Sequence, residues 1–143
     1  MGPEVAGASI AMSAVQVPPE HYDSSGYQSA ERFYSSKCQI DAILKTSPKT
    51  VLEIGIGNGF VGKYIAATGI QVVTCDIDEK LKPTVCADVR SLPFPDGGFD
   101  VVSCCEVLEH MPVEDLPKAM REISRTSRAY VVISVPDRSP YLL

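Results

Sequence analysis

A glycine-rich turn at residues 55–59 constrains the fold more than any other feature of the sequence. The apolar residues 51–54 precede it with a strand-like pattern, and residues 60–67 follow it as a candidate helix. Glycines stand at 55, 57 and 59, where they can adopt positive φ and have no Cβ to hold a ligand away. The stretch therefore predicts a strand, a tight turn and a helix start, which together bring a nucleotide-like ligand against the backbone.

Two classes of ligand can use this turn, and Glu53 discriminates between them. Residues 57–62 match the dinucleotide fingerprint G-x-G-x-x-G, whereas Glu53 and the three glycines match the E-x-G-x-G-x-G turn of S-adenosylmethionine (SAM) methyltransferases. A carboxylate at the strand end would repel a pyrophosphate, but it suits the sulfonium and ammonium groups of SAM. Glu53 therefore favours SAM. A turn without any ligand is the remaining alternative, and three glycines in five residues argue against it.

Length and composition indicate one domain of ordinary globular character. The chain has 143 residues, of which 45% are hydrophobic and 22% charged, and its formal net charge is −5. It has no basic tract, so a nucleic-acid partner is not expected, and no apolar run approaches the roughly 20 residues of a membrane span. Residues 1–20 are predicted to form a flexible tail without the features of a signal peptide, and residues 21–143 the domain. We expect a cytoplasmic protein.

The cysteines support an intracellular location. Five are present, and none has the C-x-x-C spacing of a metal site. Four fall inside strand-like runs, so we expect reduced, buried side chains and no disulfide framework. The five are Cys38, Cys75, Cys86, Cys104 and Cys105.

Strand-like and helical segments alternate along the chain. Strands are predicted at 51–54, 70–75, 84–87, 99–105 and 130–135. Helices are predicted at 28–45, 60–67 and 113–125, and a loop at 90–98. The pattern predicts an α/β fold, in which a doubly wound, mostly parallel sheet carries helices on both faces.

Apolar residues indicate which sides of these elements are buried. The strand at 70–75 is apolar enough for burial on both faces. The apolar positions of the last helix are Leu116, Met120 and Ile123, and those of the first are Phe33, Ile40, Ile43 and Leu44. The three positions of the last helix are expected to form its apolar face, and those of the first helix give partial helical spacing.

Acidic residues recur where the predicted strands end. They are Glu53, Asp76, Asp88 and Glu106, at the ends of the first four strands. The carboxyl ends of parallel strands meet at one edge of the sheet, where such sheets bind ligands, so we expect these acids to form one site. Loop polarity and helix capping are the alternative explanation.

These residues resemble the class I SAM-dependent methyltransferases, and in particular the small-domain group called methyltransferase type 11. The matching stretches are 51–59, the turn at 76, 87–102, 106–110 and 119–125, which spread the resemblance over about residues 27 to 137. It implies a Rossmann-like sheet of strand order 3-2-1-4-5, SAM as the cofactor and S-adenosylhomocysteine as its product. It also decides against a nicotinamide cofactor.

The resemblance implies a role for each residue of the motifs. Those that it places around the cofactor are Glu53, Gly55, Gly57, Asn58, Gly59, Asp76, Ile77, Asp88, Val89 and Glu106. Glu53 and the glycine turn would hold the methionine moiety, and Asp76 would accept hydrogen bonds from the two ribose hydroxyls. Ile77 would pack on the adenine, with core packing as its alternative. Asp88 would accept from the adenine amine, with the Val89 amide nearby, and a loop cap is its alternative.

The sequence also departs from the family pattern towards its C-terminal end. Five strands are readable where the family has seven, and residues 125–129 replace the usual Lys-Pro-Gly-Gly turn. In that topology the strand at 130–135 becomes an edge, which invites another strand. A fragment, a reduced domain or a partner that supplies the edge would each account for this. We expect a homo-oligomer or a partner chain at this strand.

Glu106 and His110 are the candidate catalytic residues. Methyl transfer from SAM depends mainly on proximity and alignment, so a dedicated catalytic group is not required. The resemblance places Glu106 where the substrate side of the pocket meets SAM. His110 could accept a proton near neutral pH, and a structural role is its alternative. Neither Cys104 nor Cys105 follows a proline, as the nucleophile of cytosine C5 methyltransferases does, and both are expected in the core.

The cluster Glu106-x-x-Glu109-His110 admits a second interpretation. It resembles the metal-binding half of small-RNA 2′-O-methyltransferases and of some ubiquinone-pathway O-methyltransferases. The final His of the RNA family has no counterpart in residues 136–143, and no metal is predicted.

The sequence therefore predicts a SAM-dependent methyltransferase that acts on a small molecule. One alternative is a non-catalytic interaction subunit with the same fold. Another is a metal-assisted O-methyltransferase of RNA or small molecules. A nicotinamide oxidoreductase is the weakest of the interpretations.

Overall fold

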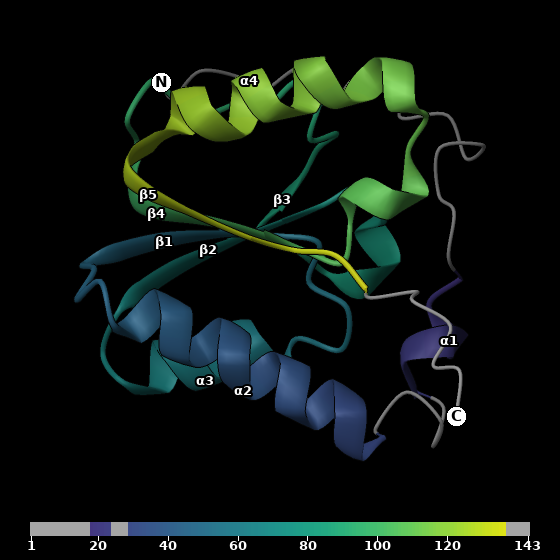
Figure 1. Ribbon diagram of the computed structural model, residues 1–143, viewed down its shortest axis with the longest axis vertical. Coiled ribbons are helices and arrows are strands. Elements are labelled where there is room, and N and C mark those ends of the chain that lie inside the picture. The colour runs from purple at the N-terminus through teal and green to yellow at the C-terminus, as the bar shows by residue number, and fades with distance from the viewer. Residues whose placement is uncertain (1–17, 24–28, 137–143) are drawn as a thin grey trace, which may run out of the picture.

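A computed structural model describes residues 18–23 and 29–136, in which helices and strands alternate along the chain (Figure 1). The strands are β1 (Thr50–Ile54), β2 (Gln71–Asp76), β3 (Val85–Cys86), β4 (Phe99–Cys105) and β5 (Ser127–Ser134). The α-helices are α1 (Glu20–Asp23), α2 (Ala30–Leu44), α3 (Phe60–Ala67) and α4 (Leu116–Thr126). Short 3₁₀ turns are η2 (Glu79–Leu81), η3 (Leu108–His110) and η4 (Val113–Asp115).

The five strands form one parallel sheet in the order β3-β2-β1-β4-β5. The predicted fold class and strand order are thereby confirmed. The order reverses direction between the neighbouring strands β1 and β4. Ligands of such sheets bind beyond the carboxyl ends of the strands at this switch.

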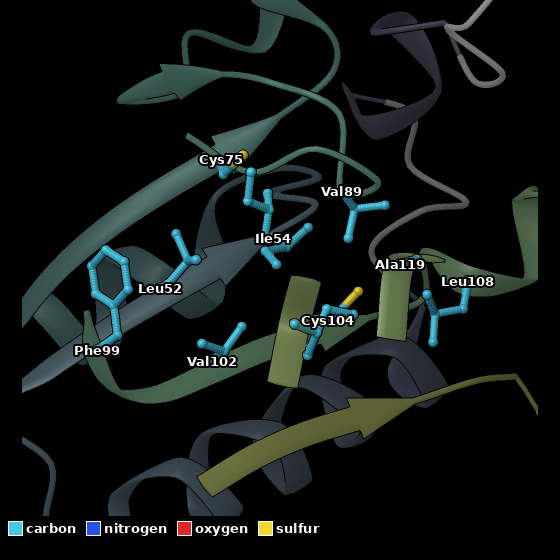
Figure 2. Close-up of a cluster of buried hydrophobic side chains, with 11 residues drawn as sticks. Leu52, Ile54, Cys75, Val89, Phe99, Val102, Cys104, Leu108 and Ala119 are labelled. Carbon is cyan, nitrogen blue, oxygen red and sulfur yellow. The ribbon is translucent and has the colours of Figure 1, made fainter. Parts of the chain in front are cut away.

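Side chains of the central strands alternate between two apolar layers, because successive residues of a strand point to opposite faces. The layer against α2 and α3 contains Ile40, Ile43, Val51, Ile65 and Val101. The layer against α4 contains Leu52, Ile54, Phe99, Val102, Cys104 and Ala119 (Figure 2). α2 and α3 cover one face of the sheet and α4 covers the other (Figure 1). Glu53, two residues from Val51 along β1, therefore points to the side of α2 and α3.

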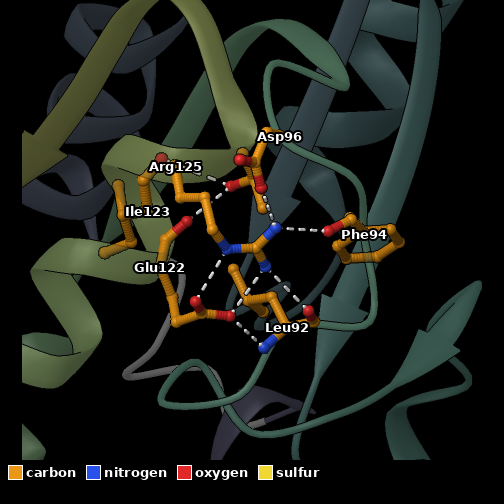
Figure 3. Close-up of polar contacts among 7 residues, drawn as sticks. Leu92, Phe94, Asp96, Glu122, Ile123 and Arg125 are labelled. Carbon is orange, nitrogen blue, oxygen red and sulfur yellow. Dashed lines mark hydrogen bonds and ion pairs between the residues drawn. The ribbon is translucent and has the colours of Figure 1, made fainter.

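Arg125 in the last turn of α4 fixes the loop between β3 and β4 (Figure 3). Its Nε and Nη2 each donate to a Glu122 carboxylate oxygen at 2.8 Å, and Nη1 donates to the Phe94 carbonyl at 2.7 Å and to Asp96 at 2.8 Å. Nη2 also reaches the Leu92 carbonyl at 3.0 Å, while the Leu92 amide donates to Glu122 at 2.7 Å. Arginine suits this place because its planar fork carries five donors.

The predicted buried face of α4 is wrong at Met120. That side chain is 40% exposed, and Ala119 and Ile123 are fully buried instead. Residues four apart share one face of a helix, and the small Ala119 allows α4 to lie close to the sheet. β5 begins at Ser127 rather than at residue 130, because it follows α4 without a loop.

β2 and two of the cysteines are more exposed than predicted. In β2 only Cys75 and Asp76 are buried, since β3 is two residues long and pairs with these two alone. Cys38 on α2 and Cys86 on β3 are exposed, whereas Cys75 and Cys104 are buried as expected. The prediction of five buried cysteines is therefore wrong for the two that lie outside the sheet centre.

The predicted division into a tail at 1–20 and a domain at 21–143 falls partly outside the described residues. Within the described ranges, no helix is long and apolar enough to cross a membrane.

Candidate functional site

The carboxyl ends of β1, β2 and β4 open into a cavity of about 1700 Å³. Pockets for a single small ligand typically measure roughly 300–1,000 Å³, so this larger cavity has room for a cofactor and a second small molecule. The predicted site residues that line it are Glu53, Gly55, Gly57, Asn58, Asp76, Ile77, Asp88, Val89, Glu106 and His110. Gly59 lines a small second cavity beside Lys63 instead. The structure thus gathers residues from four strand ends into one site.

The glycine turn adopts the backbone that its sequence predicts. The φ angles of Gly55, Gly57 and Gly59 are 77°, 52° and 74°, values that favour glycine. A Cβ at Gly55 would overlap the side chain of Val107, so no larger residue fits there. Asn58 Oδ1 accepts a hydrogen bond from the Phe60 amide at 3.1 Å, and this side chain therefore stabilises the start of α3.

Glu53 places a buried carboxylate beneath the turn. The residue is only 6% exposed, and Gly62 of α3 leaves the space that its carboxylate fills, since a Cβ at Gly62 would overlap it. Oε2 is buried without a hydrogen-bond partner among the described residues. Burial, helped by the nearby charge of Asp76 and opposed by the Gly62 amide, raises the pKa of Glu53 to about 7. A buried carboxylate of this kind is chemically suited to a cationic ligand.

Asp76 ties the glycine turn to the end of β2. Its Oδ2 accepts from the Ile56 amide at 2.9 Å and its Oδ1 accepts from the Asp78 amide at 3.0 Å. Each carboxylate oxygen can accept two hydrogen bonds, so both retain capacity for a ligand hydroxyl. Burial raises the pKa of Asp76, and the two amides oppose this rise. The geometry fits the predicted ribose contact.

Asp88 is held by Arg90, a residue that the sequence interpretation missed. Arg90 Nε lies 2.9 Å from Asp88 Oδ1, which also accepts from the Arg90 amide at 2.8 Å. Arg90 Nη1 donates to Asp115 Oδ2 at 2.6 Å, which links this loop to η4. Hydrogen bonds from the Arg90 side chain lower the pKa of Asp88. The loop-capping role is therefore present, and the adenine contact remains a prediction.

Glu106 follows β4 directly and has an unusual backbone conformation, with φ of 58°. Ser134 at the end of β5 donates its hydroxyl to Glu106 Oε1 at 3.0 Å. The Glu106 amide donates to the Ser134 carbonyl at 2.9 Å. Gln39 of α2 donates from Nε2 to the Ser134 hydroxyl at 3.2 Å. The sequence interpretation missed Ser134 and Gln39, although the placement of Ser134 at a strand end was a signal.

His110 ends η3 and lines the same cavity. Its side chain is 44% exposed, and Nε2 lies 3.7 Å from Glu109 Oε1. Among the residues that the structure describes, no three His, Cys, Asp or Glu side chains are grouped closely enough to hold a metal ion. The metal interpretation of this cluster thus has no assembled set of ligands to support it.

Aromatic side chains form a second wall of the cavity. Phe33 and Tyr34 of α2 and Phe60 of α3 line it. The ring centroids of Phe33 and Phe60 lie 5.9 Å apart. Phe33, one of the apolar positions of the predicted first helix, is 63% exposed, because the first turn of α2 extends past the sheet to the cavity.

Comparison with known protein families decides the class. A family model described as "Methyltransferase domain" matches residues 52–130, more than half of the chain. This chain belongs to the methyltransferase domain family. The match covers the glycine turn, Asp76, Asp88 and the Glu106–His110 segment, so the methyltransferase interpretation of these motifs is confirmed over the nicotinamide one.

Curated relatives of this methyltransferase domain are longer proteins. A ubiquinone biosynthesis O-methyltransferase of Bordetella parapertussis is 32% identical over 110 residues, which are 66% of this chain and 45% of that protein. One from Pseudomonas paraeruginosa is 30% identical over 118 residues, 71% of this chain and 50% of that protein. The chain thus spans about half the length of the curated relatives it matches.

Solved structures share the fold of this domain. A SAM-dependent methyltransferase from Archaeoglobus fulgidus superposes with a TM-score of 0.63 at 22% identity, covering 72% of this chain and 52% of that one. The [4+2]-cyclase SpnF superposes with a TM-score of 0.59 at 21% identity, covering 71% and 44%. At such identities the likeness establishes the fold alone, and the activity must be argued from the site.

Proposed function

We propose that this chain binds SAM and transfers its methyl group to a hydroxyl of a small molecule. The observation that carries the proposal is the buried Glu53 carboxylate beside the glycine turn, which has no partner for Oε2 among the described residues. A buried carboxylate suits the cationic methionine moiety and opposes a pyrophosphate. The names of the curated relatives support oxygen as the methylated atom.

The chain offers a partner for each part of the cofactor. Glu53 would pair with the ammonium group, and the free lone pairs of Asp76 would accept the ribose hydroxyls. Ile77 would pack on the adenine, and Asp88 with the Val89 amide would meet its edge. Bound SAM supplies a methyl group on a sulfonium, which is already activated for transfer to a nucleophile in line with the C–S bond.

The cavity favours a neutral, partly apolar acceptor. Phe33, Tyr34 and Phe60 provide an aromatic wall, on which an apolar or aromatic molecule can pack. Glu106 contributes a carboxylate on the sheet side of the cavity, and the Arg90 guanidinium is already paired with carboxylates. Glu106 therefore disfavours a phosphorylated or acidic group close to it. All five cysteines are unpaired, which supports the reducing environment of the cytoplasm.

Titration calorimetry with SAM, S-adenosylhomocysteine and NAD tests the cofactor. We expect Asp76→Ala to weaken SAM binding by about 1–3 kcal/mol through the lost charge-assisted bonds. Asp41→Ala is the matched control, because Asp41 is an exposed carboxylate on α2 that pairs with Lys37. Tighter binding of NAD than of SAM would overturn the cofactor class, and equal SAM affinity in both variants would remove Asp76 from the ribose contact.

A second candidate, an interaction subunit, is favoured by one observation. β5 lies at the edge of the described sheet and exposes Tyr130, Val131 and Ile133. Unpaired edge strands invite another strand, so a second copy or a partner chain can add here. Analytical sedimentation of the wild type and of Ile133→Lys tests it, with self-association expected in the wild type only. A protein that methylates catechol, a neutral aromatic diol, as a monomer would favour the enzyme.

A further inference from the structure

Glu106 has a backbone conformation that an L-residue rarely adopts. Its φ of 58° lies in the left-handed region, where the Cβ crowds the following carbonyl. Among described residues, the only others that share positive φ without being glycine are Ser47 and Lys82. Strain of this kind persists where the surroundings hold it, and it clusters at functional sites. Glu106 directly follows β4 and lines the cavity. The strained backbone therefore lies at the candidate site.

Two hydrogen bonds between Glu106 and Ser134 hold this conformation. The Glu106 amide donates to the Ser134 carbonyl at 2.9 Å, and the Ser134 hydroxyl donates to Glu106 Oε1 at 3.0 Å. The first continues the ladder between β4 and β5 beyond the register pair Cys105–Ser134. Backbone and side chain of Glu106 are thus fixed by one residue of the neighbouring strand.

Gln39 sets the direction of the hydroxyl. Its Nε2 can only donate, and it lies 3.2 Å from the Ser134 oxygen, which therefore accepts. The hydroxyl proton is then free to point at the Glu106 carboxylate, an acceptor. Oε1 is engaged in this way, and Oε2 has no hydrogen-bond partner among the described residues. Gln39, Ser134 and Glu106 come from α2, β5 and the end of β4, and all three line the cavity.

We infer that Gln39 and Ser134 are positioning residues, which hold Glu106 so that Oε2 accepts the proton of the acceptor hydroxyl. The inference rests on the proposed function and adds the residue that receives the proton. As the acceptor oxygen forms its bond to the methyl carbon, the C–S bond breaks and its electron pair stays on sulfur. The hydroxyl proton passes to Glu106 Oε2, so the ionised carboxylate becomes a neutral acid and charge is balanced.

The inference is tested with Ser134→Ala, Glu106→Gln and the double variant. Catechol is the acceptor probe, SAM the donor, and S-adenosylhomocysteine the ligand for binding measurements. Ser127→Ala is the matched control, since Ser127 lies on the same strand and its hydroxyl donates to the Tyr130 carbonyl. Ser134→Thr retains the hydroxyl and serves as the conservative rescue.

We expect Ser134→Ala to lower kcat roughly tenfold, as for a misplaced proton acceptor. Ser134→Thr should restore much of the rate, Ser127→Ala should leave it unchanged, and S-adenosylhomocysteine affinity should be equal in the three single serine variants. In the Glu106→Gln background, Ser134→Ala should have no further effect on kcat. Independently of turnover, calorimetry should find catechol binding to the S-adenosylhomocysteine complex weakened in Ser134→Ala and in Glu106→Gln.

Several results would overturn the inference. One is a kcat in Ser134→Ala that equals the kcat of the wild type. Another is a double variant whose kcat is reduced by the product of the two single-variant reductions. If the wild type does not turn over catechol, then catechol binding that is absent in the wild type, or equally tight in the single variants, decides against it. The proposed cofactor is tested separately, because it would be contradicted if the wild type did not bind S-adenosylhomocysteine.

Discussion

The proposed pairing of Glu53 with the ammonium group of SAM predicts that cofactor binding depends on pH. In the described structure, burial raises the pKa of this carboxyl from its ordinary value of 4.5 to about 7. The ammonium group of SAM is paired by the ionised form only, so binding must remove the proton at pH values below 7. We therefore expect the affinity for SAM to rise as the pH increases from 5 to about 8.

The size of the effect follows from the pKa. Below a pKa of about 7, each pH unit reduces the ionised fraction about tenfold, so the dissociation constant of SAM should increase about a hundredfold between pH 8 and pH 5. The free protein shows the opposite dependence. As the pH rises from 4.5 to about 7, the unfolded chain loses this proton before the folded one does, so folding stability falls over this window and stays low above it.

Glu53→Gln separates the two effects, because the amide fills the same space without a charge. We expect it to bind SAM weakly at every pH, and to be more stable than the wild type at pH 8 by up to about 3 kcal/mol, the equivalent of the pKa rise. Calorimetric titrations from pH 5 to pH 8 and urea unfolding at the same values measure both. A SAM affinity that is independent of pH, with Glu53→Gln binding as tightly as the wild type, would refute the role of Glu53 as counter-ion.

Further outcomes are expected at four residues. Arg125→Lys should lower the free energy of unfolding by about 1–3 kcal/mol in urea, because lysine cannot reproduce the planar fork, and equal stability would contradict this. Since the pKa of Glu122 is about 2, its stabilising contribution should hold above about pH 4.5 and be lost as the pH falls towards 2. Glu106→Gly should be more stable than Glu106→Ala by about 1 kcal/mol, because only alanine keeps the strained Cβ; the reverse order would contradict the strain. Because Glu106 is inferred to accept the proton, His110→Asn should leave the pH dependence of methyl transfer unchanged, and a flattened rise would make His110 the base instead. Methyl transfer should also survive EDTA, and its loss would support the metal interpretation.

The elements that the sequence predicts best are those whose local pattern agrees with the fold. β4 has the predicted bounds, 99–105, because its apolar run is buried against both layers. The glycine turn is predicted because positive φ leaves few alternatives to glycine. Met120 was misplaced because apolar character does not show how close a helix lies to the sheet. The exposure of Phe33 could not be read from the sequence, because an aromatic side chain beside a cavity has the same pattern as one in a core.

The site residues that were missed depend on contacts between distant segments. Gln39 and Ser134 are 95 residues apart in the chain, and their contact exists only because α2 covers the end of β5. The register of β5 against β4 decides that Ser134, and not a neighbour, meets Glu106. Similarly, Arg90 donates hydrogen bonds to both Asp88 and Asp115, because the fold places η4 beside the loop that follows β3. A pattern along one segment contains none of this information.

Asp76 has a further consequence through its bond to the Ile56 amide. The glycine turn is flexible by composition, and a loose turn would lose conformational entropy when it closed on a ligand. The carboxylate immobilises the turn during folding, so a ligand meets donors and a backbone that are already in place. Asp76 thus both stabilises the turn and lines the cavity. Substitution of Asp76 should consequently slow association as well as speed dissociation, because fewer turn conformations would be competent to receive the ligand.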